Sequence, residues 1–263
     1  MVRAFWMPNH NFGDNLNHYI LSRIAKDGVV FTDILDAETK VVSIGTILGW
    51  CNETTIAWGP GLGNVGDAVN PLATIRAVRG PRSRKRALEC GCKCPDVFGD
   101  PALLMPRIYR PVTEVRHKVG LIPHYVDQKV VYQRYRNTDA SIRVIDILDT
   151  PERVVDAIAS CEMILSSSLH GVIAAHAYGI PAAWVEFGDK IGGDGTKYHD
   201  YFESVGCTVA DRINCRDMPA AGTMLSRAKS HLELKVHIDT DPLLASAPFE
   251  LAPNFGSGGA IRA

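Results

Sequence analysis

The distribution of hydrophobic positions along the chain predicts short buried strands that alternate with helices. Apolar runs recur along the sequence, and most end in a turn rich in glycine, proline, asparagine or serine. Short continuous apolar runs are typical of parallel strands, which are covered on both faces. The strands predicted in this way are 2–6, 40–44, 55–58, 74–78, 97–98, 118–122, 142–148, 163–165 and 182–185.

Helical spacing and helix-boundary residues fill the intervals between these strands. Leu16, Tyr19, Ile20 and Ile24 are spaced for one face of a helix, and Gly28 follows its end. Proline at a first helical position marks other starts, as at Pro81. The further helices are predicted near 81–90, 102–106, 126–136, 150–161, 172–178 and 218–232. The alternation predicts an α/β fold built on parallel sheets.

The chain is long enough for two domains of about 100–150 residues each. Residues 107–116 are polar, include Pro111 and lack periodicity, so we place the linker there. The prediction is two Rossmann-like domains facing a cleft, at residues 1–108 and 116–240. Proline, alanine, serine and glycine dominate residues 241–263, which predicts a loosely ordered tail.

Polar residues gather at the predicted turn between the strand at 163–165 and its following helix. Ser166, Ser167, Ser168, His170 and Gly171 all fall in this turn. In parallel sheets ligands bind beyond the carboxyl ends of the strands, where helix N-termini offer free N–H groups. A lone histidine there can simply cap or pack. Three hydroxyls and a glycine beside it favour a chemical role for His170 as much as a capping or packing role.

Three other places share that kind of position. Asn11, Gly13 and Asp14 lie at a strand-to-helix junction, where Asp14 is either an N-cap or a group that orients a sugar hydroxyl. His124 follows the strand at 118–122.

Arginines at 79, 82 and 86 form one stripe at a helix start. Cations there oppose the helix dipole by about 0.3–1 kcal/mol each. A bound carboxylate or phosphate removes that mismatch and suits the arginine fork. The alternative is a solvated basic face.

Composition narrows the function classes. A net charge of −1 gives no support for nucleic-acid binding. No apolar run is long enough to span a membrane, and the N-terminus lacks the pattern of a signal peptide. Seven cysteines without an export signal predict reduced thiols in the cytoplasm. Cys90, Cys92 and Cys94 lack zinc-site spacing and a fourth ligand, so no metal site is expected.

Seven motifs, taken in order, carry a resemblance to a known family. They are Asn11–Asn15, Arg76–Ser83, Gly99–Leu104, Ile122–Tyr125, Ser166–Gly171, Tyr178–Ala182 and Lys197–Tyr201. From Asn11 to Gly206 the chain resembles the polysaccharide pyruvyl transferases, most of all the short bacterial ketal-pyruvate transferases of exopolysaccharide synthesis. Many relatives have arginine where this chain has Ser168.

The resemblance implies a fold similar to the glycosyltransferase B type and a reaction without cofactor or metal. The donor would be phosphoenolpyruvate, and the product a pyruvate ketal on a sugar residue of an exopolysaccharide repeat unit or its precursor. The acceptor would be an oligosaccharide, free or lipid-linked. The enzyme would work in the cytoplasm or at the inner face of the membrane, without a transmembrane segment.

We assign site residues from the resemblance together with the positions above. His170 and Asp14 are predicted to be catalytic, with His170 as the general acid. The predicted donor-binding residues are Arg79, Arg82, Ser166, Ser167, Ser168 and Gly171. The predicted acceptor-binding residues are Asn11, Gly13, His124 and Lys197. Two alternatives stay open: a glycosyltransferase of the same fold that uses a nucleotide sugar, and a non-enzymatic regulator that binds sugar or phosphate.

Overall fold

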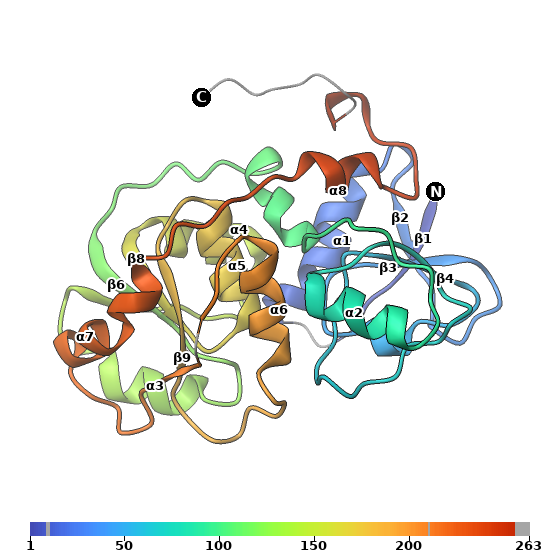
Figure 1. The fold of residues 1–263 in the computed structure, drawn as a ribbon. Coiled ribbons are helices and arrows are strands. Elements are labelled where there is room, and N and C mark those ends of the chain that lie inside the picture. Colours follow the sequence, from blue (N-terminus) through green and yellow to red (C-terminus); the bar gives the residue numbers. More distant parts are fainter. Residues whose placement is uncertain (9–10, 210, 256–263) are drawn as a thin grey trace.

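The computed structural model of the chain describes residues 1–8, 11–209 and 211–255. Two five-stranded parallel sheets form its framework, and they lie side by side in Figure 1. The first sheet contains β1 (Val2–Phe5), β2 (Val29–Phe31), β3 (Lys40–Val42), β4 (Thr55–Trp58) and β5 (Thr74–Ala77). The second contains β6 (His117–Ile122), β7 (Ile142–Val144), β8 (Cys161–Ser166), β9 (Ala182–Glu186) and β10 (Ile213–Asn214).

The two sheets share one strand order. It is β2-β1-β3-β4-β5 in the first sheet and β7-β6-β8-β9-β10 in the second, with every pair parallel. In such a doubly wound sheet the connections leave in opposite directions from the two central strands, and the crevice at their carboxyl ends is the usual ligand site. These switch points lie between β1 and β3 and between β6 and β8.

Helices connect most of the strands. They are α1 (Phe12–Ile24), α2 (Pro81–Glu89), α3 (Gln128–Tyr135), α4 (Pro151–Ala159), α5 (Leu169–Ala177), α6 (Thr196–Ser204), α7 (Ala221–Leu232) and α8 (Asp241–Ala245), with 3-10 turns η1 (Leu48–Trp50), η2 (Pro101–Arg107) and η3 (Pro253–Phe255). The α/β class predicted from the sequence is confirmed. The domain limits and the likeness to the glycosyltransferase B arrangement stay predictions. Among the described residues, no helix has the length and apolar character needed to cross a bilayer.

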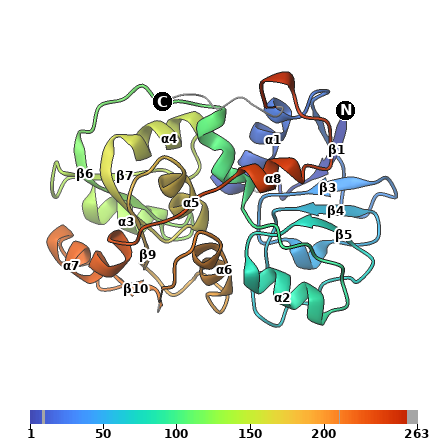
Figure 2. The ribbon, with the colours of Figure 1, turned by 45° about the horizontal axis from the view of Figure 1, so that its top comes forward.

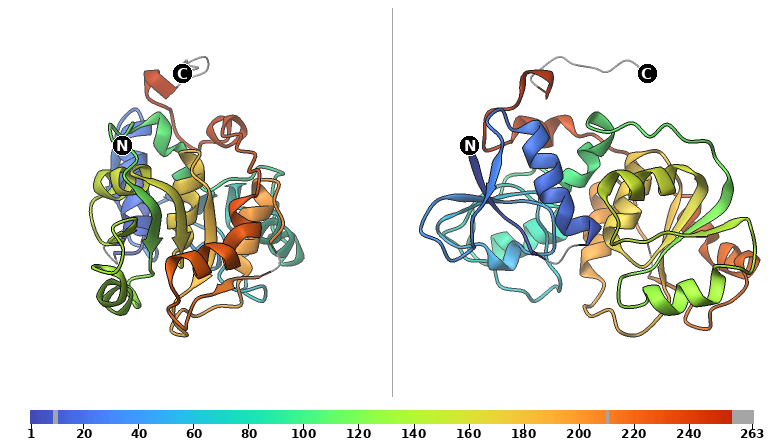
Figure 3. Two further views of the ribbon diagram at one scale, coloured as in Figure 1. Left: turned by 90° about the vertical axis from the view of Figure 1, so that its left-hand side faces the viewer. Right: turned by 180° about the vertical axis from the view of Figure 1, so that it is seen from behind.

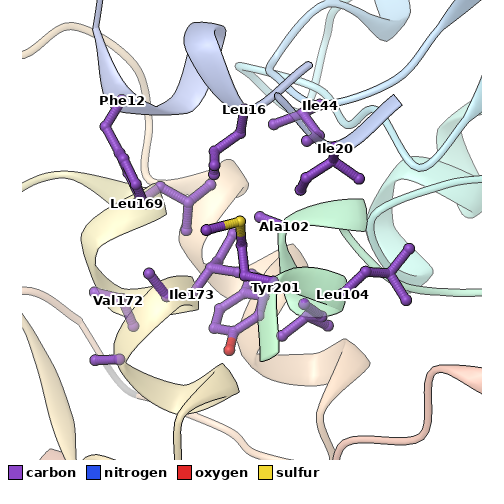
Figure 4. Close-up of a cluster of buried hydrophobic side chains, with 14 of the residues drawn as sticks. Phe12, Leu16, Ile20, Ile44, Ala102, Leu104, Leu169, Val172, Ile173 and Tyr201 are labelled. Atoms are coloured by element: carbon purple, nitrogen blue, oxygen red, sulfur yellow. The ribbon is translucent and has the colours of Figure 1, made fainter. Parts of the chain in front are cut away.

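One cluster of buried apolar side chains joins the two sheets. Figure 4 shows α1 and η2 contributing Leu16 and Leu104 from the first half, against Val172 and Ile173 of α5 from the second. The η2 turn packs directly against α5. Seen from behind, the N-terminal end of α1 is directed toward the second half (Figure 3). Burying this surface holds the halves in one arrangement, because separating them would expose it to water.

The last residues correct the expectation of a loose tail. Residues 241–255 return from the second half to the first (Figures 1 and 2), and Leu243 and Leu244 of α8 are buried there. The indole nitrogen of Trp58 donates a 2.9 Å hydrogen bond to the Leu243 carbonyl. Leu251 forms a bridge with Ala25. Apolar residues scattered among the small ones account for this packing. Residues 256–263 lie outside the described part of the chain.

Candidate functional site

The turn between β8 and α5 is built by one serine and one glycine. The Ser166 hydroxyl is buried, accepts the Ser168 N–H at 3.0 Å and lies 2.8 Å from the Ser168 carbonyl oxygen. A Cβ at Gly171 would lie 2.4 Å from that hydroxyl, so only glycine fits there. Ser166 and Gly171 therefore shape the turn. Their predicted contact with a donor stays a prediction.

His170 projects from the first turn of α5 toward the N-terminal half. A Cβ at Gly13 would lie only 2.1 Å from the His170 Nδ1 atom, so the missing side chain lets the imidazole ring lie against α1. The start of α1 is fixed by Asn11, whose Oδ1 accepts the Asp14 N–H at 3.1 Å. The Asn11 amide also donates to the Asp14 carboxylate. The structure thus brings the predicted Asn11–Asp14 turn and His170 together.

Asp100 lies on the other side of the same imidazole ring. One carboxylate oxygen caps η2 by accepting the Ala102 N–H at 2.9 Å. The other, Oδ2, lies 3.5 Å from His170 Nε2, and both atoms are buried without a hydrogen-bond partner among the described residues. The Asp100 side chain is 0% exposed and that of His170 is 15% exposed. The arrangement presents a carboxylate to an imidazole across the two halves.

Asp100 was missed as a site residue by the sequence reasoning. The signal was available, because Gly99-Asp100-Pro101 was one of the motifs that carried the resemblance and it follows an apolar pair. Its burial beside His170 could not be read from the sequence, because the two residues belong to different halves.

The switch point of the second sheet contains His124 and Ser167. The His124 N–H donates to the Ser167 hydroxyl at 2.8 Å, which ties the ends of β6 and β8 together. The Tyr198 hydroxyl of α6 donates to the Ser167 carbonyl at 2.8 Å. Burial lowers the pKa of His124 to about 4, with a smaller contribution from the positive charge of Lys197. His124 is therefore neutral near pH 7 and can accept or donate a hydrogen bond without carrying charge.

Lys197, at the start of α6, is a half-buried cation. Burial, with a smaller contribution from the positive charge of Arg79, lowers the pKa of its ammonium group to about 8. The ammonium nitrogen lies 5.4 Å from the centre of the Tyr198 ring. Within residues 1–8, 11–209 and 211–255 no carboxylate pairs with it. The structure thus places Lys197 near His124 and the serine turn. The predicted acceptor-binding roles of His124 and Lys197 stay predictions.

Arg79 is fully buried and has protein partners on several sides. Its Nε lies 3.3 Å from Asp200 Oδ2 of α6, and Nη2 donates to the Leu62 carbonyl at 2.7 Å. Nη1 donates to the Thr46 hydroxyl at 3.3 Å. A Cβ at Gly61 would lie 2.2 Å from the guanidinium carbon. These contacts pair the charge of Arg79 and bind both terminal nitrogens, while Nε has no hydrogen-bond partner among the described residues. The role of Arg79 in donor binding stays a prediction.

The predicted arginine stripe separates into different environments. Arg82 reaches α6, where its Nη2 lies 2.8 Å from Glu203 Oε1, and its side chain is 40% exposed. Arg86 pairs with Glu89 on its own helix. Arg79 is thus the member of the stripe that lies near Lys197, while Arg82 joins α2 to the outer face of α6 through a half-exposed ion pair.

No group of three or more histidine, cysteine, aspartate or glutamate side chains suited to a metal ion occurs in the described part of the chain. Cys92 and Cys94 are buried, Cys90 is half-buried, and all are free thiols. The cysteine-rich turn thus packs against the first half.

Comparison with known proteins supplies the identity of this arrangement. Residues 11–188 match the family described as polysaccharide pyruvyl transferase, a range that holds His170, Asp100, His124 and the α1 turn. The chain belongs to the polysaccharide pyruvyl transferase family. It is therefore a transferase enzyme that acts on polysaccharide, as the resemblance implied.

Two relatives extend the match beyond the family range. The chain is 29% identical over 215 residues to an uncharacterized protein of Acanthamoeba polyphaga mimivirus, covering 77% of this chain and 73% of that protein. It is 25% identical over 222 residues to the succinoglycan biosynthesis protein ExoV of Rhizobium meliloti (strain 1021), covering 81% of this chain and 67% of ExoV. No solved structure matches the chain.

Proposed function

We propose that this pyruvyl transferase moves the pyruvyl group of phosphoenolpyruvate to a sugar residue of an exopolysaccharide repeat unit or its precursor. The product is a pyruvate ketal, and phosphate is released. The observation that carries the proposal is the position of His170. It lies at the carboxyl edge of the second sheet, with its ring between Gly13 and the buried carboxylate of Asp100. A proton donor held in that way suits a reaction that begins by protonating carbon.

The proposed reaction balances without water or an oxidant. A proton is added to the methylene carbon of phosphoenolpyruvate, and the neighbouring carbon takes on oxocarbenium character. One sugar hydroxyl forms a C–O bond to that carbon and gives up its proton. The carbon–phosphate oxygen bond then breaks, and a second hydroxyl of the same sugar forms the other C–O bond. The two hydroxyls give up two protons in all. One replaces the proton that was added to the methylene carbon, and the other leaves with the inorganic phosphate.

His170 supplies the first proton in this proposal. General acid catalysis of this kind is typically worth about 10²–10⁴-fold in rate. Asp100 accepts the Nε2–H, so that Nδ1 is the nitrogen directed toward the start of α1. The 3.5 Å separation is longer than a hydrogen bond, and such pairs commonly tighten when substrate binds. Asp14, one residue from the glycine that contacts the ring, is proposed to take the hydroxyl proton.

The acceptor is proposed to lie along the α1 turn and the end of β6, contacting Asn11, Gly13 and His124. We propose no cofactor, because phosphoenolpyruvate already carries the activated group. The reaction is proposed to take place in the cytoplasm or at the inner face of the membrane, where the donor and lipid-linked acceptors meet. A glycosyltransferase B-like arrangement of the two halves around the substrates belongs to the same proposal.

Phosphate release tests this function. Purified protein would be incubated with phosphoenolpyruvate and a panel of oligosaccharides, and phosphate would be measured alongside a search for the ketal methyl group by NMR. We expect phosphate only with a suitable acceptor, in equal amount to the ketal. Consumption of a nucleotide sugar with no use of phosphoenolpyruvate would instead identify a glycosyltransferase.

A further inference from the structure

The charges buried around α6 do not balance. Arg79 and Asp200 form an ion pair in which both side chains are 0% exposed. Asp200 also accepts the Ser83 N–H at 2.9 Å and the Ser83 hydroxyl at 2.6 Å, so each of its oxygens already has a partner. Lys197, three residues earlier on the same helix, has no carboxylate partner in the described residues. Among the described residues, one half-buried positive charge is therefore left without a carboxylate.

The neighbours of Lys197 make its position more costly. The positive charge of Arg79 lies close enough to lower the pKa of Lys197, and the charge of Lys197 in turn lowers the pKa of His124. An ammonium group removed from water without a counter-ion is destabilising, and proteins normally pair or neutralise it. The cation–π distance of 5.4 Å to Tyr198 offsets only part of that cost. A ligand that brings a negative charge would complete the set.

The location fits the reaction. The hydroxyl of Tyr198, the next residue, is bonded to the carbonyl of Ser167 in the serine turn. The backbone N–H of His124 donates to the hydroxyl of the same serine. Lys197 therefore stands beside the turn that presents His170, at the switch point where ligands of doubly wound sheets bind. The sequence-based assignment placed Lys197 with the acceptor, but a neutral sugar does not compensate its charge.

We propose that Lys197 binds an anionic group of the donor, its phosphate or its carboxylate, and thereby determines which donors are accepted. This inference rests on the proposed function and names the residue that recognises the donor. Arg79, by contrast, has its charge paired with that of Asp200.

Binding measurements on matched variants test the inference. Phosphoenolpyruvate affinity would be measured by calorimetry for the wild type, Lys197→Met, Lys197→Arg and the control Lys190→Met, which removes an exposed lysine from the neighbouring loop. We expect Lys197→Met to weaken binding about 10- to 100-fold, the usual contribution of a charge-assisted hydrogen bond. Lys197→Arg should retain most of the affinity, and Lys190→Met all of it. Inorganic phosphate and pyruvate, used as separate probes, show which anionic group Lys197 contacts.

A stability measurement separates binding from a structural role. If Lys197 serves the donor, Lys197→Met should melt at the same temperature as the wild type or higher, because an uncompensated charge is gone. A lower melting temperature together with unchanged donor affinity would overturn the inference and leave the proposed function standing. Failure of the wild type to bind phosphoenolpyruvate would overturn the proposed function itself, and this inference with it.

Discussion

The two halves of the molecule have the same strand order, yet their switch points are occupied differently. Beside the first switch point, Asn17 of α1 is tied to Ile44, which follows β3. Its buried amide donates to the Ile44 carbonyl at 2.8 Å and accepts the Ile44 N–H at 2.9 Å. In the second sheet the corresponding place contains the neutral His124. Beside it lies Lys197, which has no carboxylate partner in the described part of the chain. The amide of Asn17 thus fixes the first switch point beside the α1 turn, whereas the second contains a cation that calls for an anionic ligand.

The buried cations show the same difference. Arg79 has a carboxylate and two oxygen acceptors, whereas Lys197 has none of these among the described residues. Both are basic residues near the junction of the halves, so residue type alone does not distinguish them. Their hydrogen-bond and ion-pair partners do. Groups that hold the halves together and groups that act on substrate should therefore respond differently to substitution.

The largest effect is expected from breaking the buried ion pair. Asp200→Asn leaves the Arg79 charge without compensation in a site with no solvent access. The free energy of unfolding should fall by about 3–5 kcal/mol, measured by urea denaturation. Glu203→Gln is the matched control, because its half-exposed pair with Arg82 should contribute no more than about 1 kcal/mol. If Asp200→Asn keeps the stability of the wild type but loses donor binding, Arg79 contributes to the donor site.

His170→Gln should have the next largest effect, on turnover. Glutamine retains a hydrogen-bond donor of similar reach but cannot deliver a proton. Turnover should fall by about 10²-fold or more, with the melting temperature and the phosphoenolpyruvate affinity close to those of the wild type. Steady-state phosphate release and a thermal melt check this together. If turnover stays near normal, His170 only packs between the halves, and His124 becomes the next candidate for the acid.

Sequence patterns predicted the framework well because buried strands and capped helices leave local signals. The strand at 55–58 was placed at its observed limits, and the helix beginning at Pro81 starts where predicted. Elements without such signals were missed. β2 and β10 are short edge strands, and α6 begins after Gly195 in a polar, glycine-rich stretch. The predicted strand at 142–148 ends at Val144, although Ile145 and Ile147 are buried beyond it.

The candidate site was only partly predictable for a related reason. The serine turn and His170 lie close together in the sequence, so their position at a sheet edge could be inferred. The partners of His170 come from the other half, and no local pattern indicates that Asp100 is buried beside it. Likewise the arginine stripe looked like one anion site, but Asp200, far along the chain, decides that Arg79 is paired. Long-range contacts, rather than residue types, separate the structural cations from the others.

Asp100→Asn should give a smaller loss than His170→Gln. Asparagine caps a helical turn as well as aspartate does, so η2 should remain in place. The carboxylate that orients the His170 ring would be lost, and we expect turnover to fall about 10-fold while the Michaelis constant for phosphoenolpyruvate changes little. Asp100→Glu should restore part of the rate. If Asp100→Asn lowers the melting temperature and turnover falls only in proportion to the loss of folded protein, Asp100 only supports the fold.

The smallest effect is a pH dependence of donor binding. Burial lowers the pKa of Lys197 to about 8, so the free enzyme loses this positive charge as the pH rises through that value. Affinity for phosphoenolpyruvate should therefore weaken between about pH 7.5 and 9.5, measured by calorimetry. The neighbouring groups do not titrate there, because the pKa of His124 is lowered to about 4 and burial raises that of Tyr198 above the window. Lys197→Arg should remove the dependence, since arginine stays charged. A dependence that persists in Lys197→Arg would show that another group is responsible.

The position of the bound donor tests the central claim most directly. A structure of the enzyme with phosphoenolpyruvate should show the methylene carbon about 3–3.5 Å from a His170 ring nitrogen, the range expected for reacting atoms. An anionic group of the donor should lie on Lys197, and Arg79 should keep its contact with Asp200. A donor bound away from the β8–α5 turn, for example in the open hollow lined by Arg216 and Arg227, would contradict the account.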